Sequence, residues 1–109
     1  MSATTLSTHI LDTALGVPAA GIRVRLLREG ATLGEGISDA DGRVKGFGAA
    51  ALSAGSYTLV FEVAEYFAKA KRESFYREIS VAFEIVDGRG HYHVPLLLSP
   101  FGYSTYRGS

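Results

Sequence analysis

The sequence predicts an all-β protein, a two-sheet sandwich of about eight short strands with one short helix. Apolar and polar residues alternate along much of the 109-residue chain, which is the pattern of half-buried strands. Turn residues, chiefly Gly, Pro and Asp, recur between the alternating runs. An Ala-rich segment interrupts the alternation and favours a helix. We expect these elements to form a single domain over residues 1–109.

The first half of the chain contains four predicted strands. Ile22, Val24 and Leu26 occupy alternate positions, so they share one face of a strand. Asp and Gly mark the turns, because an Asp side chain hydrogen-bonds its own backbone and Gly accepts a positive φ. The predicted strands cover 7–12, 21–28, 31–34 and 43–47, with turns at Gly16 and Pro18, at Glu29-Gly30 and at Asp39-Ala40-Asp41-Gly42.

The second half contains the helix and four further strands. The segment AEYFAKAKR over 64–72 predicts the helix, because it is Ala-rich, lacks β-branched residues and carries basic side chains at its end. Asp87-Gly88 is a dipeptide typical of tight turns, so we expect a β-hairpin there. The predicted strands cover 57–63, 78–86, 91–98 and 103–107, with a turn at 99–102 before the last.

The composition excludes several classes of function. Eleven Lys+Arg balance eleven Asp+Glu, which leaves no basic excess for a nucleic-acid partner. The chain has no cysteine, and therefore no disulfide framework, thiol nucleophile or thiolate metal site. No apolar run approaches the roughly 20 residues that span a bilayer, and no secretory signal is visible. We expect a cytoplasmic protein with no membrane partner.

The chain has three histidines, His9, His91 and His93. His91 and His93 lie two apart in a predicted strand and therefore share a face, and His9 joins them only if its strand lies beside theirs. Pro95 and Leu97 would lie on the face of His93, an unusually apolar outer face unless a partner covers it. The histidines could be ordinary surface residues. Alternatively, His91 and His93 together with His9 could hold a metal ion.

The end of the chain is the most unusual segment. We expect the last strand to run to the final residue, which would hold Tyr106, Arg107 and the Ser109 carboxylate in fixed positions. An edge strand this aromatic would pair with other chains unless something covered it, so we expect another subunit there.

Arg43 follows an Asp-Gly turn, where an arginine is usually a solvated residue at the start of a strand.

The segments STHILDTALGVPAAGIRVRL, SDADGR and HYHVPLLLSPFGYSTYRGS resemble the transthyretin-like (prealbumin-like) proteins, and among them the 5-hydroxyisourate hydrolases of urate degradation. The resemblance spans almost the whole chain, and the terminal YRGS is its most specific part. It implies two four-stranded sheets with a short helix, and a homotetramer built as a dimer of dimers. The active sites would lie at the dimer–dimer interface, in a central channel, with no cofactor.

The resemblance also implies the reaction, hydrolysis of 5-hydroxyisourate to 2-oxo-4-hydroxy-4-carboxy-5-ureidoimidazoline. Without a cysteine or an activated serine, water is the expected nucleophile, and His9 or His93 would be its general base. Arg43 would bind the substrate carbonyls and stabilise the oxyanion. His91 matches no catalytic position and is expected to be peripheral. The implied catalytic residues are His9, Arg43 and His93, and the implied substrate-binding residues are Tyr106, Arg107 and Ser109.

Two other functions fit the fold. The first is a non-enzymatic carrier of small molecules of the transthyretin type, which the histidines and the YRGS ending disfavour. The second is an immunoglobulin-like interaction module, for which the C-terminal segment would have no function. Both alternatives predict no hydrolysis.

Overall fold

Two β-sheets and a short helix make up the described part of the chain. The structure is a computed structural model and describes residues 4–48, 52–86 and 90–108. This architecture confirms the predicted fold class. In chain order the elements are β1 (Thr5–Asp12), β2 (Val17–Pro18), β3 (Arg23–Arg28), β4 (Ala31–Ile37), β5 (Arg43–Val44), β6 (Gly55–Glu62), α1 (Ala64–Lys69), β7 (Ile79–Ile85), β8 (His91–Ser99) and β9 (Gly102–Thr105).

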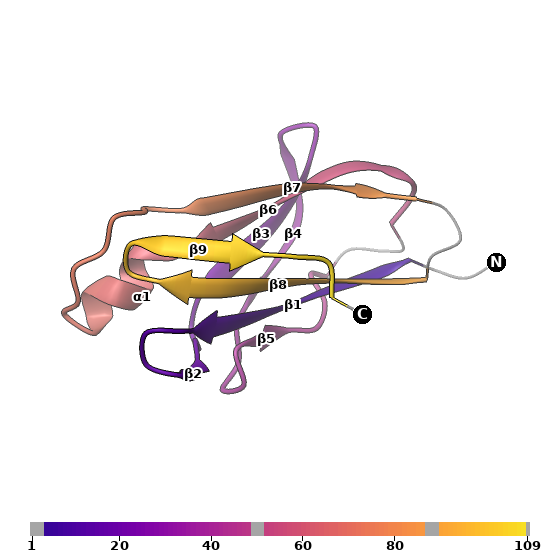
Figure 1. The fold of residues 1–109 in the computed structure, drawn as a ribbon. Helices are drawn as coiled ribbons and strands as arrows, with labels where there is room; N and C mark the ends of the chain where they lie inside the picture. The colour runs from indigo at the N-terminus through magenta and orange to yellow at the C-terminus, as the bar shows by residue number, and fades with distance from the viewer. Residues whose placement is uncertain (1–3, 49–51, 87–89, 109) are drawn as a thin grey trace.

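The strands divide between two sheets, named here after their central strands. The β6 sheet has the order β4-β3-β6-β7, and all its pairs are antiparallel. The β8 sheet has the order β2-β1-β8-β9, and β5 also pairs with β1. Figure 1 shows β1, β8 and β9 in one layer in front of β3, β4 and β6, with α1 at one end. Because β1 and β8 pair in parallel, the first strand and one of the last lie side by side.

The apolar residues of the alternating runs form a core between the sheets. Ile22, Val24 and Leu26 are at most 1% exposed, as their alternation predicts. Burying a side chain of this size stabilises a fold by about 1.5–3 kcal/mol relative to exposure. Other large side chains that are wholly or almost wholly buried are Ile10, Leu59, Phe61, Phe67, Ile79, Ile85, Leu96 and Leu98.

A buried ion pair ties the end of β1 to the segment after α1. Asp12 is completely buried, and its Oδ2 accepts hydrogen bonds from Arg72 Nη1 and from the Tyr66 hydroxyl, each 2.7 Å long. Its Oδ1 accepts hydrogen bonds from the backbone N–H groups of Ala14 and Leu15, both 3.1 Å long. Burial by itself would raise the pKa of Asp12, but these hydrogen bonds and the Arg72 charge hold it below 3.8.

The helix and the strand that carries Arg43 are each at most about two-thirds as long as the sequence predicts. α1 ends at Lys69 instead of residue 72, because the chain turns at Ala70 and Lys71 takes a left-handed conformation with φ +55°. β5 covers only Arg43–Val44 of the predicted 43–47, since its pairing with β1 stops there. Among the described residues, no helix is long and apolar enough to cross a membrane.

Two predictions about the last strands are wrong. Asp87 and Gly88 lie outside the described residues, but the flanking strands cannot form a hairpin, because β7 pairs with β6 and β8 pairs with β1 and β9. The last strand does not run to the end of the chain. β9 ends at Thr105, after which the backbone leaves the ladder and returns at Gly108 as an isolated bridge to His93.

Candidate active site

The parallel pairing of β1 with β8 brings His9 and His93 to the same face of the β8 sheet. In the register Ser7 lies opposite His93, and His9 lies opposite Pro95. Alternate residues of a strand share a face, so these side chains project to the same side. That side is turned away from the core, because Ile10, the neighbour of His9, points inward and is completely buried.

Arg43 reaches this face from the short strand β5. In the β1–β5 pairing it lies directly opposite His9. The turn before β5 fixes its backbone: Asp39 Oδ1 accepts hydrogen bonds from the N–H groups of Asp41, at 2.9 Å, and of Arg43, at 3.0 Å. The structure therefore brings together His9, Arg43 and His93, which lie far apart in the sequence.

Gly42 allows the turn to lie against β1. Its φ is +76°, a conformation that side-chain-bearing residues rarely adopt, and a Cβ there would collide with the Ile10 carbonyl. The Gly42 carbonyl in turn accepts a hydrogen bond of 2.7 Å from the Ile10 N–H. Close approach of this turn to β1 holds Arg43 beside His9.

A chain of hydrogen bonds runs along the same face. Thr5 Oγ1 lies 2.5 Å from His91 Nδ1, and Ser7 Oγ lies 2.9 Å from His91 Nε2 and 2.8 Å from His93 Nδ1. The sequence interpretation gave Thr5 and Ser7 no role and treated His91 as peripheral. Both hydroxyls alternate with His9 along the first strand, which is the signal that could have found them once that strand is paired with the one that carries His93.

The four basic side chains on this face, His9, Arg43, His91 and His93, are called the basic cluster below. Burial lowers the pKa of His93 below 6.5, and the charges of Arg43, His9 and His91 lower it further, against a smaller opposing effect of a hydrogen bond at the Ser7 backbone. His93 is therefore neutral at pH 7, whereas Arg43 keeps its charge. A neutral imidazole can accept a proton, and a fixed guanidinium can stabilise a developing negative charge.

The end of the chain contacts the cluster through Gly108. Its N–H donates a hydrogen bond of 2.7 Å to the His93 carbonyl. A Cβ at Gly108 would lie 2.6 Å from His93 Cδ2, closer than such atoms can approach. The absence of a side chain at residue 108 therefore lets the backbone lie against the His93 ring.

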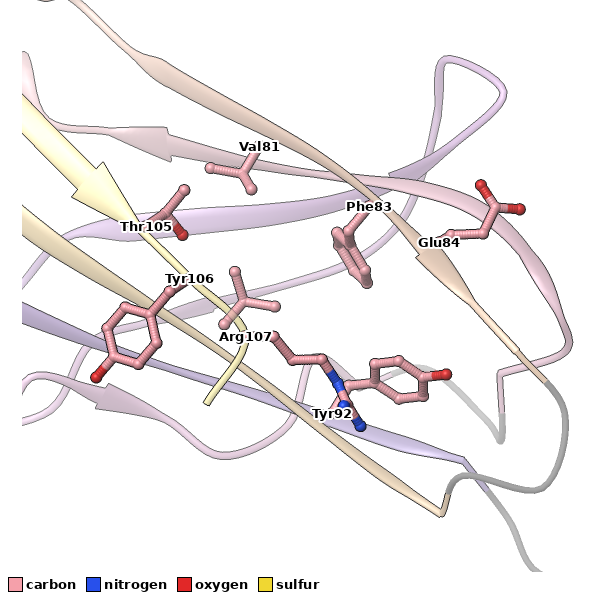
Figure 2. A pocket seen from close by; sticks show the side chains of 8 residues that line it. Val81, Phe83, Glu84, Tyr92, Thr105, Tyr106 and Arg107 are labelled. Atoms are coloured by element: carbon pink, nitrogen blue, oxygen red, sulfur yellow. The ribbon is translucent and has the colours of Figure 1, made fainter. Parts of the chain in front are cut away.

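Arg107 and Tyr106 lie apart from the basic cluster. The Arg107 guanidinium is 5.3 Å from the centroid of the Tyr92 ring, on the core side of β8, opposite to the side of His93. Figure 2 shows the Arg107 side chain extended toward Tyr92 and the ring of Tyr106, which is 57% exposed, turned away from it. Ser109 lies outside the described residues. A cavity of about 200 Å³ at this point is lined by Val81, Phe83, Glu84, Tyr92, Val94, Thr105, Tyr106 and Arg107.

The histidines do not form a metal site in the described part of the chain. No group of three His, Cys, Asp or Glu side chains there could hold a metal ion. His91 and His93 are instead joined through the Ser7 hydroxyl. The metal alternative considered from the sequence thus has no support in the described residues.

The fold is that of the transthyretin-like proteins. The chain superposes on a transthyretin from Sparus aurata with a TM-score of 0.86 and 29% identity, over 95% of this chain and 96% of that one. Residues 6–108 match the family described as the HIUase/Transthyretin family, and the chain belongs to that family.

Two relatives with higher identity are hydrolases by name. The solved structure of a 5-hydroxyisourate hydrolase from Klebsiella pneumoniae is similar with a TM-score of 0.89 and 50% identity, over 96% of this chain and 99% of that chain. A 5-hydroxyisourate hydrolase from Deinococcus radiodurans is 44% identical over 113 residues, which cover 95% of both chains. These findings confirm the family that the sequence resembled.

Proposed function

We propose that this protein is a hydrolase of urate degradation that opens 5-hydroxyisourate to 2-oxo-4-hydroxy-4-carboxy-5-ureidoimidazoline. The named hydrolases to which it is 44–50% identical support this activity. Within the structure, the observation that carries it is the cross-strand pair of His9 and Arg43 beside His93 on one open face. One histidine can act as the base, Arg43 is a fixed cation, and the other histidine can make a polar contact with the substrate.

The reaction adds one water across a C–N bond of the six-membered ring. The base takes a proton from water as the oxygen attacks the ring carbonyl carbon, which forms a tetrahedral oxyanion. Arg43 stabilises the oxyanion, because its charge and planar donors are fixed before the reaction. The C–N bond then breaks, and the leaving nitrogen takes the proton back from the base.

His93 is the better candidate for the base. Its lowered pKa keeps its lone pair free at neutral pH. The charges of Arg43 and His9 disfavour an added proton on His93, and His93 therefore returns the proton readily to the leaving nitrogen. His9, opposite Arg43, then contacts the substrate.

The proposal includes a homotetramer, a dimer of dimers in which the outer faces of two β8 sheets meet. Leu97 is half-buried on the face that carries His93 and offers apolar surface beside the basic cluster, which suits such an interface, whereas Pro95 on the same face is already buried within the chain. Tyr106 and Arg107 are proposed to bind substrate together with Ser109. The ring of Tyr106 is already turned away from Arg107 and Tyr92, whereas Arg107 has to leave Tyr92 first. The reaction needs no cofactor, and the cytoplasmic location stays a prediction.

The site assignment is tested by substitution. His9→Ala, Arg43→Ala and His93→Ala are each expected to reduce turnover by about 100-fold or more, the usual contribution of a general base or an oxyanion donor. Turnover is measured as the decay of the absorbance of 5-hydroxyisourate made in place from urate by urate oxidase. Arg23→Ala, an exposed arginine on the β6 sheet, is the matched control and keeps the wild-type rate. Near-normal rates in all three variants would show that the reaction takes place elsewhere.

A further inference from the structure

Ser7 occupies a position between two imidazoles that the pairing of the strands builds. The β1–β8 register sets Thr5 opposite His91 and Ser7 opposite His93. The Ser7 hydroxyl oxygen is 2.8 Å from His93 Nδ1 and 2.9 Å from His91 Nε2, so one hydroxyl bridges both rings. Thr5 Oγ1 closes the chain at His91 Nδ1. Thr5 and His91 are exposed, whereas His93 is half-buried.

The number of donor protons allows this chain of hydrogen bonds only two arrangements while both imidazole rings are neutral. A serine hydroxyl has one proton to donate, and a neutral imidazole has one donor and one acceptor nitrogen. In the first arrangement His93 donates from Nδ1 to Ser7, Ser7 donates to His91 Nε2, and His91 donates from Nδ1 to Thr5. This leaves the lone pair of His93 Nε2 free. In the second every bond is reversed, and His93 Nε2 carries the proton.

We propose that Ser7 and His91 are positioning residues for the hydrolysis, which orient the His93 ring and carry its Nδ1 proton to solvent. This inference rests on the proposed function. As His93 Nε2 takes a proton from water, its Nδ1 proton passes to Ser7 Oγ, the Ser7 proton passes to His91 Nε2, and His91 Nδ1 releases a proton through Thr5 to solvent. The reverse transfer returns His93 to its first arrangement when Nε2 gives its proton to the leaving nitrogen.

The surroundings of His93 explain why such a chain is useful. Arg43 on β5, His9 on β1 and His91 on β8 all face His93, and they and its burial disfavour an imidazolium there. If the hydrogen-bond chain carries the Nδ1 proton away while Nε2 takes a proton from water, His93 acts as a base without holding both protons. The backbone of Gly108 packs against the Cδ2 edge of the ring, so the ring is held from both sides.

The test compares Ser7→Ala with Ser7→Thr in the 5-hydroxyisourate decay assay. Loss of the bridging hydroxyl is expected to lower kcat by about ten-fold, the equivalent of one hydrogen bond lost in the transition state, with KM nearly unchanged. Ser7→Thr keeps a hydroxyl and is expected to restore kcat. Ser56→Ala, an exposed serine of β6, is the matched control with the wild-type rate.

The rates in H₂O–D₂O mixtures distinguish proton transfer along the chain from simple packing. The wild type is expected to show a curved dependence on the D₂O fraction, because several protons move together, and Ser7→Ala a linear one. His91→Phe also removes one of the groups that lower the pKa of His93, so the kcat/KM of this variant is expected to fall off in acid at a higher pH than that of the wild type. A wild-type kcat in Ser7→Ala, or equal losses in Ser7→Ala and Ser7→Thr, would overturn the inference. A wild-type protein without activity would instead overturn the proposed function.

Discussion

Replacing Asp12 by asparagine removes the negative charge from the buried ion pair that joins β1 to the segment after α1. The carboxylate is completely buried and bonds to Arg72, Tyr66 and two backbone N–H groups. Asparagine has nearly the same shape and keeps one oxygen for the backbone donors. Its NH₂ group, however, faces the Arg72 guanidinium, which then has no anion to bind.

The expected loss follows from the burial of the two partners. Removing one member of a buried ion pair costs about 3–5 kcal/mol, because the remaining charge is left without a partner. The Arg72 side chain is 20% exposed and can regain part of its hydration, so a loss of about 3 kcal/mol is expected. A domain of this size has a stability of about 5–15 kcal/mol. The variant should therefore fold, with a Tm lower by about 10–20 °C.

Denaturant and thermal unfolding at fixed protein concentration measure this loss. The folded-state pKa of Asp12 is below 3.8, so its contribution is present above that pH and disappears as the pH falls through the folded-state value. The difference in the free energy of unfolding between the wild type and Asp12→Asn should therefore become smaller in acid. Glu35→Gln, which breaks an exposed pair with Arg23, is the control and should cost less than about 1 kcal/mol. If Asp12→Asn lost less than about 1 kcal/mol of stability, or if the difference in stability from the wild type did not change in acid, the buried ion pair would not stabilise the fold as expected.

Three further predictions concern the candidate site. Gly108→Ala places a Cβ against the His93 ring and should lower kcat in the decay assay. Gly102→Ala is the control, because its Cβ meets only ordinary contacts, and it should keep the wild-type kcat. Equal rates in the two variants would contradict the packing of Gly108 against His93. Gly42→Ala is strained by the φ of +76° at this position and should lower both Tm and kcat, because the turn that holds Arg43 moves. An unchanged Tm would argue against this role of Gly42 in the turn. Since burial lowers the pKa of His93, kcat/KM should fall to half of its plateau value only below pH 6.5. A midpoint at or above pH 6.5 would exclude His93 as the base.

The sequence predicted the local features of the fold well. Ile22, Val24 and Leu26 lie in the core as their alternation indicated, because a strand's period of two is set by its own backbone. The turn at Asp87-Gly88 was misinterpreted for a related reason. Such a dipeptide describes the bend of the chain and does not say which sheet the next strand joins. β7 and β8 lie in different sheets, a consequence of packing between distant segments.

The candidate site was predictable in part. The histidine face of β8 followed from the spacing of His91 and His93, but its meeting with His9 depends on a parallel pairing of strands more than 80 residues apart. No local pattern encodes that pairing, so the chain through Ser7 could not be predicted. Arg107 was placed with the substrate by resemblance, whereas within this chain it lies over Tyr92. Its position depends on a backbone that leaves β9 at Thr105, which alternation alone does not reveal.

The proposed hydrolysis of 5-hydroxyisourate by side chains of this protein alone can be tested in one assay. The most direct measurement follows the ultraviolet absorbance of 5-hydroxyisourate, formed from urate by urate oxidase, with and without the protein and with a chelator added after the urate is consumed. We expect a faster decay that the chelator does not change. A decay that the protein does not accelerate would contradict the proposed hydrolysis and favour the carrier, and an acceleration lost with chelator would point to a metal ion in the reaction.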